Sequence, residues 1–175
     1  MLDEQTLELL EQVPEEMFQF EIGVQSTLPE TLQNVGRQAS LQRLADNVHF
    51  LRTRTNIHLH LDLIAGLPGE DYPQFLQSID WVSALSAHHL QIEPVKLLPG
   101  APLRLQAQSW GIEYDPSPPY TILKSKQLGF DDLERLRGIG RLLDLFVNSG
   151  RFSFLLQKLS AHFTRLSLLL EDLDR

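Results

Sequence analysis

The chain has 175 residues, which is enough for one domain with a sizeable hydrophobic core. Its 23 acidic and 15 basic residues give a formal net charge of −8, and this balance disfavours a nucleic-acid partner, because nucleic-acid binding relies on neutralising phosphates with Lys and Arg. The sequence contains no cysteine, which excludes disulfides, thiolate nucleophiles and any cysteine-ligated cluster within it.

The N-terminal segment is acidic and carries neither the basic region nor the apolar core of a secretion signal, so we expect a cytoplasmic protein. No apolar run approaches the roughly 20 residues that a membrane helix requires, so we expect no membrane partner. A short helix is predicted within residues 3–12 and is ended by Pro14.

The first strand is predicted over residues 18–24, where apolar and polar side chains alternate. Pro29 fits the first turn of a following helix, and Gly36 is expected to end it. A second helix begins at Ser40, because apolar residues then recur at helical spacing as far as Leu51.

A second alternating strand is predicted over residues 57–65. Alternation places Leu59, Leu61 and Leu63 on one face. The opposite face carries His58, His60, Asp62 and Ile64.

The turn Gly66-Leu-Pro-Gly69 follows this strand, and Asp71 is predicted to cap the next helix. A third strand is predicted over residues 90–97. Its end should be irregular at Pro94, because proline cannot donate a hydrogen bond to a neighbouring strand.

Strands separated by helices predict βαβ units and a parallel sheet. If the apolar faces meet the helices, a polar set lines the other face: Gln19, Glu21, Gln25, His58, His60, Asp62, Gln91 and Glu93. Ordinary barrel interiors are packed with Val, Ile and Leu, so this polar set indicates a wet interior that holds a ligand.

The C-terminal third of the chain loses the βα rhythm. We predict a short helix within residues 101–110, a proline-rich loop over residues 114–120, and a helix from Leu133 to Phe146 that contains two glycines. A final helix is predicted from Phe154 to Leu173.

The predicted fold class is therefore α/β: a partial (half) TIM-like (β/α) barrel with about three parallel strands, followed by an α-helical C-terminal region. Residues 1–110 would form the half-barrel and residues 111–175 the helical extension. Three strands cannot close a barrel, and parallel edges left unpaired must be covered, so the sequence looks like a piece of something larger.

Two segments carry a family resemblance, Phe20-Glu-Ile-Gly-Val-Gln-Ser26 and His58-Leu-His-Leu-Asp-Leu-Ile-Ala-Gly-Leu-Pro-Gly-Glu70. They resemble the fourth and fifth strands of the radical S-adenosylmethionine (radical SAM) barrel, and residues 90–103 resemble the sixth. The likeness extends over roughly residues 2–153 and is closest to bacterial proteins with a cobalamin-binding domain upstream of the barrel. Their C-terminal region is similar to Pro-Pro-Tyr120 and Asn148-Ser-Gly-Arg-Phe152.

The resemblance implies that three side chains contact S-adenosylmethionine (SAM). Gln25 stands where the family's Gly-Val-Gln glutamine contacts SAM, and Arg37, in Val-Gly-Arg, matches an arginine that also reaches it. Asp62 matches the aspartate that binds the ribose hydroxyls. The residue types suit these roles, because a carboxylate accepts from two vicinal hydroxyls and guanidinium offers a planar donor fork to a carboxylate.

The resemblance further implies an adenine pocket. The family's Gly-x-Ile-x-Gly-x-x-Gly turn is met by Ile64, Gly66 and Gly69, although an aspartate replaces its first glycine. Backbone groups around Val95 and Lys96 would meet the adenine edge.

The chain departs from the family in lacking the CxxxCxxC cluster loop, the glycine-rich motif for the SAM amino group and the cobalamin domain. The resemblance therefore implies the C-terminal portion of a radical SAM enzyme, inactive alone and dependent on an N-terminal radical SAM half in the same gene or in a separate chain. The [4Fe-4S] cluster and cobalamin would belong to that absent part. We assign no catalytic residue here, and the small-molecule substrate is undefined.

Two other functions stay open: a non-catalytic protein-interaction domain derived from a half-barrel, and a metal-dependent hydrolase built on His58-x-His60-x-Asp62. Plainer interpretations also exist for single residues. Asp62 fits an acidic residue at a strand-to-helix turn, Gln25 fits turn chemistry, and Arg37 fits a solvated charge at a helix end.

Overall fold

The computed structural model describes residues 2–159 and 161–174. Its elements, in chain order, are α1 (Glu4–Leu10), β1 (Gln19–Gln25), α2 (Pro29–Asn34), α3 (Leu41–Arg54), β2 (His58–Ala65), α4 (Tyr72–Ala84), β3 (His89–Pro94), α5 (Pro102–Leu105), β4 (Glu113–Tyr114), β5 (Ile122–Lys124), α6 (Phe130–Leu142), the π-helical turn η1 (Leu143–Asn148), α7 (Ser153–Leu159) and α8 (Leu166–Leu173). Among these described residues no helix combines the length and the apolar character needed to cross a bilayer.

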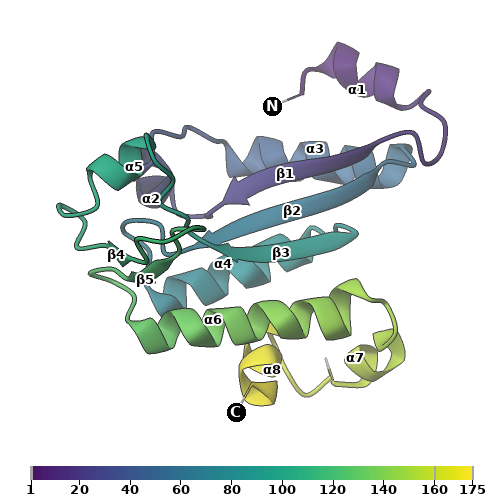
Figure 1. Ribbon diagram of the computed structural model, residues 1–175. Helices are drawn as coiled ribbons and strands as arrows, with labels where there is room; N and C mark the ends of the chain where they lie inside the picture. Colours follow the sequence, from purple (N-terminus) through teal and green to yellow (C-terminus); the bar gives the residue numbers. More distant parts are fainter. Residues whose placement is uncertain (1, 160, 175) are drawn as a thin grey trace.

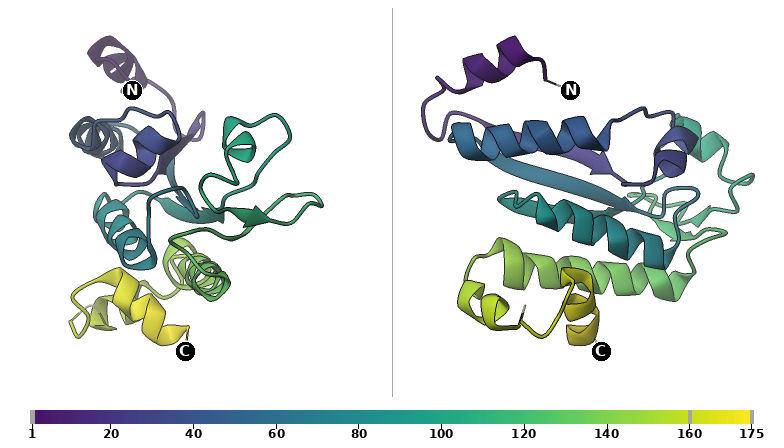
Figure 2. Two further views of the ribbon diagram at one scale, coloured as in Figure 1. Left: turned by 90° about the vertical axis from the view of Figure 1, so that its left-hand side faces the viewer. Right: turned by 180° about the vertical axis from the view of Figure 1, so that it is seen from behind.

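The centre of the fold is a parallel sheet in the order β1-β2-β3, which confirms the predicted α/β class (Figure 1). The register aligns Gly23 of β1 with Asp62 of β2, and Asp62 with Gln91 of β3. Helices α3 and α4 cover one face, and the opposite face is left open along most of the strands (Figure 2). The alternation predicted from sequence therefore sorts apolar side chains toward the helices and polar ones away from them.

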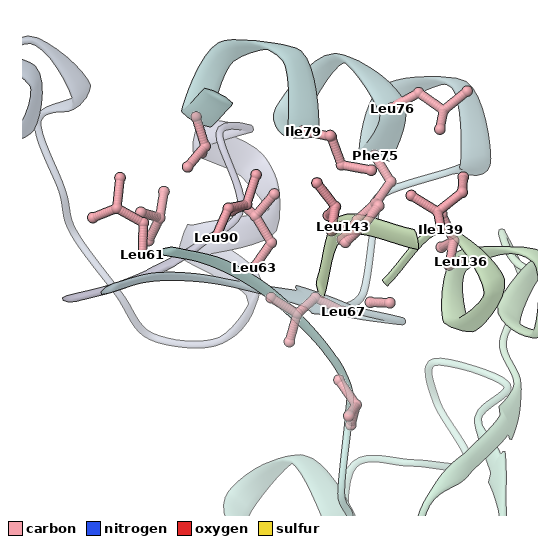
Figure 3. Close-up of a cluster of buried hydrophobic side chains, with 14 of the residues drawn as sticks. Leu61, Leu63, Leu67, Phe75, Leu76, Ile79, Leu90, Leu136, Ile139 and Leu143 are labelled. Atoms are coloured by element: carbon pink, nitrogen blue, oxygen red, sulfur yellow. The ribbon is translucent and has the colours of Figure 1, made fainter. Parts of the chain in front are cut away.

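The apolar core lies between the sheet and the helices (Figure 3). Leu59, Leu61 and Leu63 of β2 are each 0% exposed, as are Phe75 and Ile79 of α4. Helix α6 and η1 add to the same cluster Leu133, Leu136, Ile139 and Leu143. Each buried side chain of this size contributes about 1.5–3 kcal/mol, so α6 is held mainly by burial against the half-barrel.

Two predicted helix starts are confirmed at the level of hydrogen bonds. The Ser40 hydroxyl accepts from the Arg43 N–H at 3.3 Å at the start of α3. At α4 the Asp71 carboxylate accepts from Gln74 N–H and the Gln74 side chain accepts from Asp71 N–H, both at 2.9 Å, which completes a capping box.

The third strand is shorter than predicted, because β3 ends at Pro94. The chain beyond it pairs with a different partner: the N–H of Leu97 donates to Tyr120 O at 2.8 Å, and the N–H of Ile122 donates to Val95 O at 2.9 Å. The antiparallel pair β4–β5 extends this region. It was not predicted, because two- and three-residue strands carry no periodicity that a sequence pattern could show.

The predicted single helix from Phe154 to Leu173 is wrong. The leucine pattern instead forms α7 and α8, separated by turns over residues 161–165. The start of α8 is anchored on α4, where the N–H and hydroxyl of Ser167 both donate to the Asp80 carboxylate, at 2.8 and 2.7 Å. No local sequence pattern predicts these two hydrogen bonds. They hold the start of α8 where the helix packs against α4 and α6.

The two edges of the sheet differ. At the β3 edge the Asn148 side chain hydrogen-bonds to the backbone of Leu90, so the expectation of open parallel edges on both sides is wrong there. Within the described residues β1 pairs with β2 alone, and its outer edge borders a hollow of about 630 Å³. Apolar residues of β1, α2 and α3 line this hollow: Phe20, Ile22, Val24, Leu32, Leu41 and Leu44.

Candidate functional site

The polar set predicted from sequence alternates along the strands with the buried residues that pack toward α3 and α4, so it lies on the opposite, open face of the sheet. Gln19, Glu21 and His58 are exposed toward the N-terminal ends of the strands. Gln25, His60, Asp62, Gln91 and Glu93 are half-buried. Because these polar side chains do not belong to the apolar core, they can hydrogen-bond to a polar ligand without any change in the packing of that core.

Gln25 and Arg37 meet around Gly23 at the C-terminal end of β1. The register slips between Gly23 and Gln25, and Gln25 adopts a positive φ of 71°, which turns its side chain back over the strand. Its Nε2 occupies the space that a Cβ at Gly23 would need. Arg37, from the loop after α2, donates from Nη1 to Gly23 O at 3.0 Å. The missing side chain of Gly23 therefore makes this convergence possible.

Asp62 lies beside this cluster, because it is the register partner of Gly23. Burial raises the pKa of the Asp62 carboxyl, and the nearby Glu21 carboxylate raises it further, while His60 and His89 oppose the shift. Among the described residues its carboxylate makes no hydrogen bond. Asp62 thus presents a half-buried acceptor to the open face, which fits a ligand with paired hydroxyls.

The turn after β2 is shaped by protein packing. Gly66 and Gly69 have φ of 96° and 93°, a region that favours glycine. A Cβ at Gly66 would lie 2.8 Å from Ile122 Cδ1, and one at Gly69 would lie 2.8 Å from Asn34 Nδ2. Both glycines are therefore explained by the turn and its neighbours in the protein. Ile64, half-buried on the open face, is the member of this motif placed to contact a ligand.

The segment after β3 is largely occupied. Val95 donates its N–H to Ala65 O and accepts from the N–H of Ile122, both at 2.9 Å, so its peptide groups are already bonded. Lys96 Nζ donates to Glu93 Oε2 at 2.9 Å, and Gln91 Nε2 donates to Glu93 Oε1 at 3.0 Å. The Lys96 bond is the main cause that lowers the pKa of Glu93. A ligand that lies over β3 would contact the hydrogen-bonded side chains of Gln91, Glu93 and Lys96.

Four histidines form a cluster at the other end of the sheet, near the N-terminal ends of β2 and β3. His58 stacks on His88 and His60 on His89, with ring centroids 4.4 and 4.3 Å apart. The sequence pattern alone did not place His88 and His89 beside the strand histidines. The parallel register, which pairs His60 with His89, is the signal that could have revealed the cluster.

The histidine cluster does not have the geometry of a metal site. Within the described ranges no group of three or more His, Asp or Glu side chains could hold a metal ion. Burial is the main cause that lowers the pKa of His58 and of His88, which favours neutral rings that stack.

A buried polar cluster behind the site was also missed from the sequence. Ser26 directly follows the strand glutamine, Glu70 directly follows the Gly66–Gly69 turn, and both are 0% exposed. Ser78 of α4, also 0% exposed, donates to Glu70 Oε1 at 2.8 Å. A polar residue immediately after each strand-end motif is a weak signal, because solvated turns show the same residues.

Comparison with solved structures shows the fold. The chain is similar to TsrM, a radical S-adenosylmethionine methyltransferase from Kitasatospora setae, with tryptophan substrate and a SAM analog bound, at 20% identity and a TM-score of 0.56 over 71% of this chain and 25% of that one. A second TsrM structure, with cobalamin and a [4Fe-4S] cluster, matches at 20% identity and 0.56, over 77% and 28%. Coproporphyrinogen III oxidase (HemN) from Escherichia coli, described as a radical SAM enzyme, matches at 19% identity and 0.50, over 64% and 31%.

The chain thus corresponds to part of the fold of radical SAM enzymes and spans about a quarter to a third of the length of these structures. Residues 108–173 also match a sequence family described as "Protein of unknown function (DUF4080)". No curated protein matches the chain.

Proposed function

We propose that this chain is the C-terminal portion of a radical SAM enzyme of the cobalamin type and that it contributes SAM contacts. One observation carries the proposal: Gln25, Arg37 and Asp62, which the sequence motifs single out, lie together around Gly23 on the open face of the sheet. Similarity of the fold to radical SAM enzymes supports the same assignment.

Each of these residues has a definite role in the proposed site. The Asp62 carboxylate accepts hydrogen bonds from the ribose hydroxyls. Arg37 donates to the methionine carboxylate, and the Gln25 amide donates or accepts beside it. Ile64 covers one face of the adenine ring by apolar contact. A reduced cluster would supply one electron to SAM, which would break the C5′–S bond and give methionine and a 5′-deoxyadenosyl radical.

The cluster itself does not fit this chain, because no cysteine is present to ligate iron. We therefore propose that the [4Fe-4S] cluster and cobalamin are bound by an N-terminal radical SAM half, which is either another part of the same gene product or a separate chain. The open edge of β1 and the adjoining hollow are the surface on which that half would add its next parallel strand.

Calorimetric titration of the 175-residue chain with SAM tests the proposal. We expect binding by the wild type and an affinity about tenfold lower for Asp62→Ala, because two hydrogen bonds to a charged acceptor are lost. Asp46→Ala is the matched control, since Asp46 is an exposed carboxylate on α3 that accepts from Gln42 at 2.9 Å. A folded wild-type chain that binds no SAM would refute the proposed site.

A non-catalytic interaction domain is the second candidate, and the open β1 edge beside an apolar hollow favours it. The two candidates differ in what Asp62 does. Tolerance of Asp62→Ala in cells, together with absent SAM binding, would support the interaction domain. Loss of function with Asp62→Ala in a folded protein would support the enzyme.

A further inference from the structure

Glu70 is a buried carboxyl that the proposed site does not use. It follows the Gly66–Gly69 turn and leads into α4, its side chain is 0% exposed, and it does not reach the open face of the sheet. Because burying a carboxyl is costly unless it is bonded or neutral, its position requires an explanation.

The contacts of Glu70 join two segments that are distant in the sequence. Ser78 donates to Glu70 Oε1 at 2.8 Å. The Ser78 Oγ is also 2.7 Å from Thr27 Oγ1 and accepts from the Thr27 N–H at 3.3 Å. The nearby Ser26 hydroxyl, which accepts from the Leu28 N–H at 3.0 Å, acts to lower the pKa of Glu70. Ser26 and Thr27 follow Gln25 directly, so Glu70 links the segment after β1 to the turn after β2.

The surroundings of Glu70 favour its neutral form. Burial raises its pKa to about 7, bonds from Ser78 and Ser26 oppose the shift, and the Asp71 carboxylate adds to it. No basic side chain among the described residues pairs with it. The polar groups that act on it are the hydroxyls of Ser78 and Ser26 and the carboxylate of Asp71, and Ser78 in turn contacts Thr27.

Part of the cluster is unsatisfied. Among the described residues Glu70 Oε2 and Thr31 Oγ1 are buried side-chain oxygens that lack a hydrogen-bond partner. Thr31 belongs to α2 and lies near the same turn, because its Oγ1 would be 3.6 Å from a Cβ at Gly69. Burial with one oxygen unpaired makes ionisation of the carboxyl costly, although the bond donated by Ser78 by itself favours the charged form.

We propose that Glu70 is a positioning residue of the site: its carboxyl holds the Gln25–Thr27 segment against the Gly66–Gly69 turn and thereby sets the spacing between Gln25 and Asp62. The inference rests on the proposed SAM site. Glu70 touches no ligand, so it acts through the two segments that carry the ligand contacts. Because burial penalises the ionised carboxyl, ionisation favours opening of this cluster to solvent, and SAM affinity therefore falls as the pH rises through about 7.

The first test needs no ligand. Hydrogen exchange is measured on the backbone amides of residues 25–28 in wild type, Glu70→Ala and Glu70→Gln, with Glu30→Gln as the control at an exposed acidic position of α2. We expect exchange about tenfold faster in Glu70→Ala and near wild type in Glu70→Gln and Glu30→Gln. Unchanged exchange in a folded Glu70→Ala protein would overturn the proposal. If that variant does not fold, Ser78→Ala breaks the same link and decides in its place.

The second test is the pH profile of SAM affinity at about pH 6 and about pH 8. The wild type should weaken severalfold at the higher pH, whereas Glu70→Gln should lose this dependence and keep the affinity that wild type has at the lower pH. Protonation of SAM itself changes with pH in the same way for both proteins. The difference between their pH profiles of SAM affinity is therefore due to Glu70. Equal profiles would overturn the positioning role. Absence of wild-type binding would instead refute the SAM site, and hydrogen exchange would still decide whether Glu70 joins the two segments.

Discussion

The side-chain amide of Asn148 hydrogen-bonds to both backbone polar groups of Leu90, accepting from its N–H at 3.1 Å and donating to its C=O at 2.9 Å. It thus imitates a neighbouring strand at the β3 edge. The π-helical turn η1 positions the amide, and Asn148 Nδ2 also donates to Asp144 Oδ1 at 2.8 Å. Edge strands invite pairing with other chains, and this contact blocks such pairing at Leu90.

Asn148→Ala should lower the free energy of unfolding by about 2 kcal/mol, because it leaves both backbone groups of Leu90 without their partner. Urea unfolding measures this change. Ser149→Ala is the control: its hydroxyl donates to Leu145 O within the same turn and supports no strand, so we expect a change below about 0.5 kcal/mol. Equal effects of the two substitutions would show that the amide does not stabilise the edge.

The raised pKa of Glu70 predicts that the folded chain loses stability as the pH rises above neutrality. Its pKa rises from an ordinary 4.5 to about 7 in the folded chain, so the unfolded state releases this proton at lower pH than the folded state. Stability is therefore fully present below about pH 4.5 and is lost as the pH rises through about 7, by about 3 kcal/mol at about 1.4 kcal/mol per pKa unit.

Chemical unfolding of wild type and Glu70→Gln across this pH range checks the sign. The wild type should lose stability between about pH 6.5 and pH 8, above the ordinary pKa of histidine, whereas the amide variant should show a flatter profile over that range. The stacked histidines do not interfere at the upper end, because the lowered pKa values of His58 and His88 affect stability on the acid side. A wild type whose stability rises over the range would contradict the prediction.

Two glycines of α6 should respond differently to alanine. Gly140 faces Ile92, and a Cβ there would lie 3.6 Å from Ile92 O, an ordinary contact. Gly140→Ala should therefore raise the free energy of unfolding by up to about 1 kcal/mol, since glycine costs that much in a helix. At Gly138 a Cβ would overlap the Asp174 carboxylate, so Gly138→Ala should gain less or lose stability. Thermal unfolding compares the two variants, and identical shifts in melting temperature would show that the Asp174 carboxylate does not crowd a side chain at Gly138.

Metal removal should leave the histidine cluster unaffected. The rings of His60 and His89 are stacked with an interplanar angle of 13°, so their in-plane nitrogen lone pairs do not converge on one point. We expect the purified chain to carry less than stoichiometric zinc and to melt at the same temperature with and without EDTA. Stoichiometric zinc whose removal lowers the melting temperature would revive the hydrolase interpretation.

Much of the half-barrel followed from local patterns. The alternation of residues predicted β1, β2 and the faces of these strands, and Ser40 and Asp71 predicted the starts of α3 and α4. Each of these signals depends only on neighbours within a few residues. The short pair β4–β5 and the break between α7 and α8 did not follow. β4 and β5 are too short to show a periodic pattern, and the start of α8 depends on a contact between Ser167 and Asp80, which lie far apart in the sequence.

The sequence by itself determined the α/β class, the polar face of the sheet and the absence of a cysteine-ligated cluster, since composition and two-residue periodicity state these directly. Only the tertiary structure decided that Gln25 and Arg37 converge over Gly23, that Asn148 caps the β3 edge at Leu90, and that Ser78 bridges Glu70 and Thr27. Each of these depends on strand register or helix docking, which long-range packing selects and no local pattern encodes.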